Sequence, residues 1–437
     1  MIQNKTVKNA AWIIGCRIIQ AGLGLVVTML SARYLGPSGY GLINYAASLV
    51  AFFVPIMQLG LNATLVQEIV SEPDREGETM GTAMAMTFVS SIACIIGVAA
   101  FSAFANRGET QTILVCALYS FLLMFQSLEM IQYWFQAKLK SKYTSLTILA
   151  AYIMISAYRI FLLANGCSLY WYAISQAIDF AIIAAVLFVI YHQLHGQRLR
   201  VSWKLAGQML GKSKYYIVSA LMVTIFGQTD RVMLKLMIDE AAVGFYSAAV
   251  GCAGLTSFVF VAIIDSARPS ILKAKDQSAN LFCQRMKTLC TIIIYLALAQ
   301  SVAITALARI AVKILYGSEY EATIPVLRII VWYTTFSYLG AVRDIWILAN
   351  GKQKYLPYIN LSGASLNVAV NFLLIPRFGA AGAAFASLAT QIFTNFILSF
   401  WIKPIRETGY IMLASFDPRE AFKLVKHASS VLRMDRT

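Results

Sequence analysis

Apolar runs long enough to cross a membrane recur from one end of the chain to the other, and no other feature constrains the fold as strongly. Each run has roughly 20 residues, which as a helix spans the hydrocarbon core of a bilayer, about 30 Å thick. Charged residues make up 13% of the 437 residues, against roughly 25% in soluble domains. We therefore expect an all-α integral membrane protein.

The runs predict about 12 transmembrane helices, and an even number places both termini on the same side of the membrane. The first run, residues 10–35, is too long for the apolar part of a signal peptide and carries Arg17, so we expect an uncleaved first span. The predicted spans are residues 10–34, 40–62, 80–105, 112–135, 143–164, 170–191, 213–237, 242–266, 288–309, 323–348, 355–375 and 382–402.

Lysine and arginine are concentrated in alternate loops. With a cytoplasmic N-terminus, the cytoplasmic segments hold about four times as many of these residues as the opposite loops, which is the bias expected of membrane proteins. The same residues account for the net charge of +16. A nucleic-acid-binding protein would gather such charge on one folded face. We therefore expect both termini in the cytoplasm, and anionic membrane lipids as partners of the basic loops.

Polar segments divide this layout. Hydrophobic and basic residues recur at helical spacing in residues 192–214 and in the C-terminal tail, which is typical of helices that lie at the membrane interface. Residues 68–78 hold five carboxylates and one arginine, and are interpreted as a solvated loop or as the ion-pair partner of a basic loop from the other half. The predicted organisation is an N-terminal six-helix lobe (1–191), a cytoplasmic amphipathic linker (192–214), a C-terminal six-helix lobe (215–403) and a cytoplasmic amphipathic tail (404–437).

The two halves resemble each other weakly at an offset of 203 residues, which aligns residues 41–43 (GLI) with residues 244–246 (GFY). Six spans in each half give both copies the same orientation in the membrane. This arrangement implies a pseudo-two-fold axis along the membrane normal, as in transporters built from parallel repeats. Two pseudo-symmetric six-helix lobes around a central cavity would provide alternating access by rocking against each other.

Residues 32–42, ARYLGPSGYGL, closely resemble the first-loop signature of polysaccharide flippases, the Wzx-type O-antigen and capsule transporters of the multidrug/oligosaccharidyl-lipid/polysaccharide exporter superfamily. The resemblance covers nearly the whole chain, and it implies two six-helix bundles in the bacterial inner membrane. A peptidoglycan-precursor flippase of the same superfamily would carry more spans than predicted here. Further stretches that agree in order and spacing are residues 59–62, 229–234, 243–246, 315–320 and 377–384.

The resemblance also implies a substrate and a pathway. The substrate would be an undecaprenyl-diphosphate-linked oligosaccharide repeat unit, carried from the cytoplasmic to the periplasmic leaflet. The product would be O-antigen, capsule or exopolysaccharide. Polymerase and chain-length proteins of the same pathway would be its partners.

Arginine side chains inside the spans are candidates for binding the diphosphate. A charge at the centre of the bilayer costs roughly 2.5–3.5 kcal/mol to insert, so such residues face the protein interior or a wet cavity. Guanidinium groups stay charged when buried and bind phosphate oxygens in a bidentate manner. We expect Arg17, Arg231 and Arg343 to line a cationic cavity, with Arg159 as a weaker candidate. As alternatives, Arg17 could reach back to the interface, and Arg343 could pair with a carboxylate of a neighbouring helix.

Four carboxylates inside the spans are candidates for a coupling ion, either H⁺ or Na⁺: Asp230, Asp179, Asp344 and Glu129. The sequence has no Walker A pattern, so ATP hydrolysis by this chain is not expected to drive transport. Asp230 is favoured because it lies in the seventh span, near the repeat interface. A neutralising ion pair with an arginine is an equal alternative for each of the four.

Glu129 belongs to a polar stripe, with Gln126, Gln132 and Tyr133, on an otherwise apolar helix. Amide and aromatic side chains of this kind suit a sugar ligand in a polar cavity wall. Hydrogen bonding between neighbouring helices explains the stripe equally well.

Other classes of protein fit less well. The sequence has no Asp-x-Asp pattern and no cluster of histidine with carboxylates, so we expect no enzyme activity. The 7 cysteines and 3 histidines show no metal-ligand spacing, so apart from the coupling ion we expect no metal and no cofactor. The alternative function is a cation-coupled multidrug exporter of the same superfamily, which would favour a cavity of carboxylates and aromatic rings.

Overall fold

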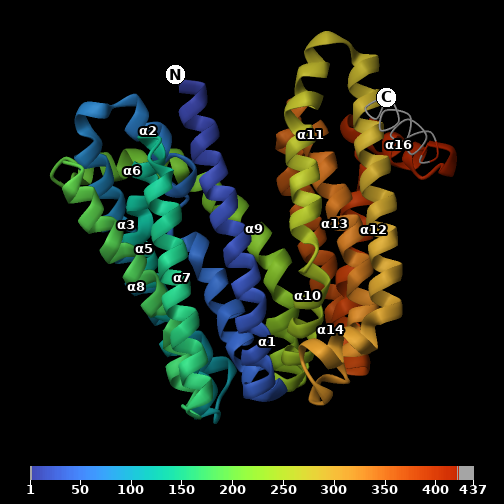
Figure 1. Cartoon of the computed structure of the whole chain (residues 1–437), viewed down its shortest axis with the longest axis horizontal. Helices are drawn as coiled ribbons and strands as arrows, with labels where there is room; N and C mark the ends of the chain where they lie inside the picture. The colour runs from blue at the N-terminus through green and yellow to red at the C-terminus, as the bar shows by residue number, and fades with distance from the viewer. Residues whose placement is uncertain (1, 421, 423–437) are drawn as a thin grey trace, which may run out of the picture. The chain divides into compact units, whose positions relative to one another are not determined.

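The computed structural model describes the backbone of residues 2–420 and Phe422, and their side chains except those of residues 2–14, Arg17 and Ile18. Helices joined by short turns make up the described part of the chain, which contains no β-strand, so the predicted all-α fold is confirmed (Figure 1). The α-helices are α1 (Ile2–Met57), α2 (Leu65–Ser71), α3 (Glu76–Ala105), α4 (Thr110–Ser120), α5 (Leu122–Leu128), α6 (Gln132–Ala137), α7 (Ser141–Ala164), α8 (Leu169–Gln193), α9 (Trp203–Met237), α10 (Glu240–Gly254), α11 (Ser257–Gln277), α12 (Ala279–Leu315), α13 (Thr323–Ala349), α14 (Leu356–Ile392), α15 (Leu398–Trp401) and α16 (Arg406–Ser415).

Among the described residues, 9 helical stretches are long and apolar enough to cross a membrane. A tenth stretch results if α10 and α11, which are bent by 46° at their junction, form one span. Each of the predicted spans overlaps one of these ten stretches. The count is lower than the predicted one because Ile19–Met57 and Gln353–Trp401 each contain two predicted spans.

A glycine interrupts each of these two long stretches. Gly36 in α1 (φ 67°, ψ 176°) and Gly379 in α14 (φ 54°, ψ −133°) have non-helical backbone angles. Glycine adopts a positive φ with little steric cost, because it has no Cβ. A straight helix of 39 residues would be about 58 Å long, nearly twice the thickness of the hydrocarbon core. We therefore place the boundary between two spans at each of these glycines.

Contacts within the chain divide it into two compact units, Met1–Gly244 (unit 1) and Phe245–Thr437 (unit 2). The sequence places α9 in the second lobe, but by its contacts α9 belongs to unit 1, where it packs against α1 and α3. The predicted lobes follow from topology rather than from contacts, so their boundaries stay a prediction.

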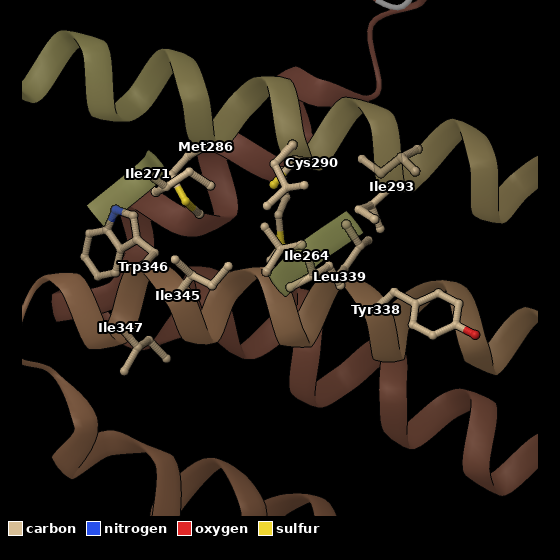
Figure 2. Close-up of a cluster of buried hydrophobic side chains, with 14 of the residues drawn as sticks. Ile264, Ile271, Met286, Cys290, Ile293, Tyr338, Leu339, Ile345, Trp346 and Ile347 are labelled. Carbon is tan, nitrogen blue, oxygen red and sulfur yellow. The ribbon is translucent and has the colours of Figure 1, made fainter. Parts of the chain in front are cut away.

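Each unit has its own hydrophobic core. In unit 1 the core includes the fully buried Leu65 and Phe135, and the rings of Trp134 and Tyr191 meet edge to face with their centroids 4.9 Å apart. In unit 2 the core lies between α11, α12 and α13, where Leu339 is fully buried (Figure 2).

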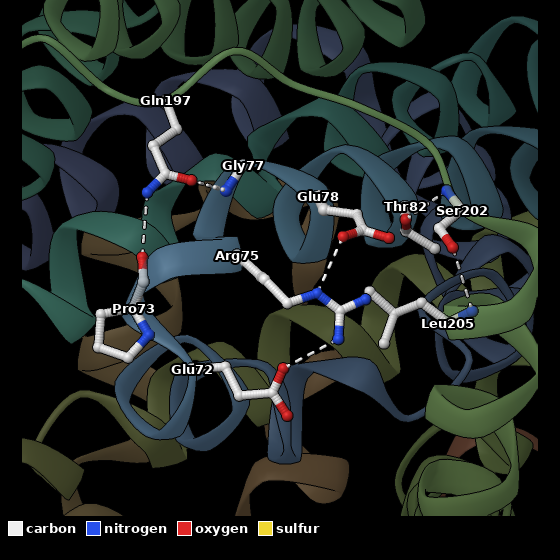
Figure 3. Close-up of polar contacts among 9 residues, drawn as sticks. All are labelled: Glu72, Pro73, Arg75, Gly77, Glu78, Thr82, Gln197, Ser202 and Leu205. Carbon is white, nitrogen blue, oxygen red and sulfur yellow. Dashed lines mark hydrogen bonds and ion pairs between the residues drawn. The ribbon is translucent and has the colours of Figure 1, made fainter.

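The acidic segment of residues 68–78 is held by ion pairs. Glu68 lies 2.7 Å from the ammonium group of Lys212, at the start of α9. Arg75 pairs with the glutamates three residues before and after it, at 3.2 Å and 3.0 Å (Figure 3). Glu68 is therefore paired rather than only solvated, but its partner lies on α9 of the same unit and not in a basic loop of the other half.

Residues 194–202, the connecting segment, join α8 to α9 without forming a helix. The side-chain amide of Gln197 donates to the carbonyl of Pro73 (3.0 Å) and accepts from the backbone of Gly77 (3.1 Å) (Figure 3). The backbone N–H of Arg200 also donates to the carbonyl of Gly77, at 3.2 Å. The connecting segment is thus fixed to the first turn of α3.

The predicted interfacial helix over residues 192–214 is wrong as a separate element. Its first part is the non-helical connecting segment, and its remainder is the start of α9. Ser202 sets the boundary, because its hydroxyl accepts a hydrogen bond from the backbone of Leu205 and so caps the helix. The backbone N–H groups of Arg200 and Ser202 donate to α3 instead, to the carbonyl of Gly77 and to the hydroxyl of Thr82.

Gly41 and Gly244, which the repeat offset of 203 places in register, pack against each other inside unit 1. A Cβ at Gly41 would lie 1.8 Å from the carbonyl oxygen of Glu240 and 2.8 Å from the backbone nitrogen of Gly244. A Cβ at Gly244 would lie 2.1 Å from the carbonyl oxygen of Pro37. The two backbones therefore approach each other at a distance that only glycine permits.

Candidate functional site

Arg159 on α7 is the candidate cation whose surroundings are best defined. Its Nε donates to the hydroxyl of Ser175 (2.9 Å) and its Nη2 donates to the side-chain carbonyl of Gln176 (2.8 Å), both on α8. The guanidinium also lies 5.4 Å from the centre of the Tyr172 ring. Among the described residues no carboxylate forms an ion pair with it, so neutral groups hold a charged side chain in a half-buried position.

Two candidate carboxylates lie in the interior of unit 1, and the first of them, Asp179, is close enough to Arg159 for their charges to interact. Asp179 is one helical turn along α8 from Ser175, and its side chain is 7% exposed. Its Oδ1 has no hydrogen-bond partner in the described structure, although its charge interacts with that of Arg159. Glu129, 8% exposed, sits in a 3₁₀ turn between α5 and α6, close enough for the charges of the two carboxylates to interact.

Arg159, Asp179 and Glu129 therefore form one cluster, supplied by α7, α8 and the turn before α6. We call these three residues the unit 1 charge cluster.

Asp230 and Arg231, on α9, make a second group in unit 1. Asp230 is 5% exposed, and Arg231 donates from Nη1 to the side-chain carbonyl of Gln228 at 2.9 Å. The same carbonyl accepts a hydrogen bond from Ser48 on α1 (3.0 Å). The Gln228 carbonyl thus links Arg231 on α9 to Ser48 on α1, and Asp230 and Arg231 each make a further interaction.

Lys235, one turn beyond Arg231, is buried with two glutamates that the sequence did not point to as partners. Its ammonium group lies 2.6 Å from Glu109, in the loop between α3 and α4, and 2.8 Å from Glu240, at the start of α10. The hydrogen bond from Lys235 lowers the pKa of the Glu109 carboxyl below its ordinary value. The only signal in the sequence was the position of a lysine near the end of an apolar span.

Arg343 and Asp344 form a pair in unit 2. The Arg343 side chain is 4% exposed, and its Nε and Nη2 donate to Oδ1 of Asp344 at 3.2 Å and 2.9 Å. Its Nη1 donates to the carbonyl of Thr394 at 2.8 Å. Thr394 lies in a π-helical turn (Phe393–Ile397), where the altered spacing leaves backbone groups available to side chains. The carboxylate partner is thus the next residue in the sequence, not one on a neighbouring helix.

The candidates therefore occupy three places. Arg159, Asp179 and Glu129 lie together, Asp230 and Arg231 lie on α9, and Arg343 and Asp344 lie in unit 2. The side chain of Arg17 lies outside the described residues, so its role in lining a cavity stays a prediction. In the described part of the chain, no three histidine, cysteine or carboxylate side chains gather as metal ligands would.

Comparison with known proteins shows which solved structures the fold resembles. Lipid II flippase MurJ, in an inward closed conformation, superposes with a TM-score of 0.73 at 16% identity, over 92% of this chain and 90% of that one. An inward-facing multidrug resistance MATE family transporter of the MOP superfamily gives 0.67 at 13% identity, over 89% and 94%. A MOP superfamily transporter from Pyrococcus furiosus gives 0.55 at 10% identity, over 92% and 95%.

Likenesses at such low identity show the fold, which is that of MurJ and the MATE transporters. No curated protein matches the sequence. Residues 6–275 match the family described as polysaccharide biosynthesis protein. This match covers more than half of the chain and includes the signature at residues 32–42, so the resemblance seen in the sequence is confirmed. The chain belongs to the polysaccharide biosynthesis protein family.

Proposed function

We propose that this protein is a flippase that moves undecaprenyl-diphosphate-linked oligosaccharide repeat units from the cytoplasmic to the periplasmic leaflet of a bacterial inner membrane. The observation that carries the proposal is the family match over residues 6–275. Transport would proceed by alternating access, for the synthesis of O-antigen, capsule or exopolysaccharide. Both termini would lie in the cytoplasm, as the distribution of lysine and arginine favours.

Arg159 supports an anionic substrate. Its guanidinium is held by the neutral groups of Ser175 and Gln176 rather than neutralised by a carboxylate ion pair among the described residues. A diphosphate would supply the missing negative charge and two oxygens in the geometry that a guanidinium binds. Arg343, in contrast, already has Asp344 as its partner. Arg159 is therefore our first candidate for binding the headgroup.

Asp179 supports coupling to H⁺ or Na⁺. A buried carboxylate with an oxygen that makes no hydrogen bond is costly unless a proton or a cation joins it. Glu129 nearby adds a second negative charge, which favours uptake of a positive ion. We propose that substrate and coupling ion act on the same charge cluster of unit 1, because a cation on Asp179 would weaken the attraction between Asp179 and Arg159 and so leave the guanidinium available to the diphosphate.

A cation-coupled multidrug exporter is the second candidate. It is favoured by the same two carboxylates, Asp179 and Glu129, which would attract a cationic drug, and by the fold shared with MATE transporters. The two functions differ in what they require of Arg159: a flippase needs the positive charge, whereas an exporter of cations does not.

The test is to measure undecaprenyl-diphosphate-linked repeat units on the cytoplasmic face in cells that lack the chain, and after adding variants back. We expect the repeat unit to accumulate without the protein, Arg159→Gln to leave transport reduced about tenfold or more, and Arg159→Lys to restore part of it. Arg268→Gln is the matched control, because Arg268 is exposed in unit 2 and its one ion pair among the described residues is with Asp265. If cells without the chain and without a redundant flippase export the repeat unit normally, the flippase proposal is wrong.

A further inference from the structure

Unit 1 contains a pocket of about 240 Å³, and of the groups named above only Gln132 of the polar stripe is among its described lining residues. It opens between α1, α6 and α7, near the turn at residues 138–140, which the sequence predicts to be cytoplasmic. We call it the amide pocket. Its lining residues are Cys16, Gln20, Gln132, Gln136, Ser141, Thr144, Ser145 and Ile148.

The spacing of these residues explains why they share one pocket. Residues four apart lie on the same face of a helix, and α1 and α6 each contribute such a pair. On α7 the lining residues are separated by three, one and three positions, which also describes a single face. The turn between α6 and α7 is closed by a hydrogen bond from Lys140 N–H to the carbonyl of Phe135 (2.7 Å), with Leu139 at φ 54°. This tight reversal brings the two helical faces together.

The chemistry of the wall is neutral and rich in hydrogen-bonding groups. None of the described residues that line the pocket is charged, and all but Cys16 and Ile148 carry an amide or a hydroxyl. The hydroxyl of Thr144 is buried without a hydrogen-bond partner in the described structure. No hydrogen bond between described residues engages the side-chain amides of Gln20, Gln132 or Gln136. A ligand that both donates and accepts hydrogen bonds would satisfy these groups.

These properties exclude several kinds of ligand. A hydrophobic drug would leave the buried Thr144 hydroxyl without a hydrogen bond, which is costly, and would cover the glutamine amides without pairing them. A phosphate or a cation would find no opposite charge among the described lining residues. The volume is below the roughly 300–1,000 Å³ of a typical ligand pocket, so it suits one small ring rather than a whole oligosaccharide.

We propose that the amide pocket is a subsite for one uncharged sugar ring of the transported oligosaccharide. The sugar hydroxyls donate to and accept from the three glutamine amides, and Thr144 gains the partner that it lacks. This inference rests on the proposed flippase function for the source of the sugar, but binding itself can be measured without transport. The subsite would select repeat units by a ring that lies apart from the diphosphate near Arg159.

The experiment is saturation-transfer difference NMR on the full chain in nanodiscs, with glucose, galactose and N-acetylglucosamine as uncharged probes and glucuronate as a charged one. Gln132→Leu and Thr144→Val remove hydrogen-bonding groups from the pocket with little change in volume. Their matched controls are Gln208→Leu, on the exposed surface of α9, and Thr147→Val, which is buried on α7 but does not line the pocket. Melting temperatures of all four variants verify that each is folded.

We expect at least one uncharged sugar to show transfer above empty nanodiscs, and the signal to fall about fivefold or more in Gln132→Leu and Thr144→Val but not in the controls, as the loss of a hydrogen bond predicts. The proposal is overturned if no uncharged sugar binds, if both pocket variants bind like the wild type, or if glucuronate binds as well as the uncharged sugars. Repeat-unit accumulation in cells is measured separately. If the purified chain binds sugar but cells that lack the chain transport the repeat unit normally, only the flippase function is refuted. If cells that lack the chain accumulate the repeat unit but the purified chain binds no sugar, only the subsite is refuted.

Discussion

The contact between Gly41 and Gly244 leads to the sharpest prediction about the fold. We expect Gly41→Ala to lower the stability of the protein, because the added Cβ would lie 1.8 Å from the carbonyl oxygen of Glu240, where an ordinary van der Waals contact begins at 3.4 Å. Relief of this overlap requires the backbones to separate by about 1.6 Å along the line of contact. The atoms involved belong to the backbone, so no side chain can rotate to make room.

The expected magnitude follows from two opposing terms. Inserting a methyl group into a closely packed contact costs about 1–3 kcal/mol, and more where the backbone must move. Alanine in a helix is favoured over glycine by about 1 kcal/mol. With the steric cost at the upper end of its range, the free energy of unfolding falls by about 2 kcal/mol. For a unit as large as Met1–Gly244, this loss lowers the melting temperature by about 4–8 °C.

The assay is thermal unfolding of the full chain in detergent, followed by the fraction that remains monodisperse after heating. Gly22→Ala is the matched control: it lies on the same helix, and a Cβ there would meet no atom within 4 Å. We expect this control to be neutral or slightly stabilising. Gly244→Ala should resemble Gly41→Ala, and the double variant should lose less than the sum, because one separation of the helices relieves both overlaps. If Gly41→Ala melts no lower than Gly22→Ala, the close backbone contact does not exist.

Three further predictions concern the ion pairs of Lys235 and the core of unit 2. Replacing both Glu109 and Glu240 by glutamine should lower the free energy of unfolding by on the order of 3 kcal/mol, because the charge of Lys235 is then buried without a partner. Lys235→Met should change the free energy of unfolding little. If denaturation shows equal losses for the two variants, this reasoning is wrong. Because the pKa of Glu109 is lowered in the folded protein, its pair with Lys235 stabilises the fold above the ordinary glutamate pKa of about 4.3 and stops doing so as the pH falls through the lowered value. The melting temperature should therefore fall less steeply with acid in Glu109→Gln than in the wild type, and identical profiles would count against the pair. Leu339→Ala in the core of unit 2 should cost about 2–5 kcal/mol, while Leu373→Ala, which is 59% exposed, should change little in the same unfolding assay.

The helical spans could be predicted from the sequence because membrane insertion imposes one length and one composition on every span. The sequence also predicts a break between residues 34 and 40, and Gly36, which lies there, has non-helical backbone angles. The connecting segment was not predicted, because an amphipathic pattern does not reveal that α3 offers hydrogen-bond partners at Gly77. The segment does not form a helix, because it makes hydrogen bonds with Pro73 and Gly77, which lie more than a hundred positions away in the sequence.

The charged groups were found by type, but their pairing could not be predicted. Neighbours at i and i+1 point away from each other on a helix, so the sequence suggested that Arg343 pairs with a carboxylate on another helix. In the structure the long side chain of Arg343 reaches Asp344, the next residue, instead. Arg159 was ranked last among the arginines, because nothing in the sequence shows that Ser175 and Gln176 would hold it without a carboxylate ion pair. The amide pocket depends on the angle between three helices, which hydrophobic periodicity does not determine.

The attachment of the connecting segment to α3 also bears on protein engineering. A stretch between two predicted lobes is the natural choice for inserting a tag, a fluorescent protein or a protease site. Here such an insertion would disrupt the hydrogen bonds of Gln197 and Arg200 and press side chains against Gly77, where a Cβ would already lie 2.5 Å from the carbonyl of Arg198. The loop at residues 106–109 is no better, because Glu109 holds Lys235. The turn at Gly166, with its positive φ of 65° and its short polar loop between α7 and α8, is the better place to open the chain.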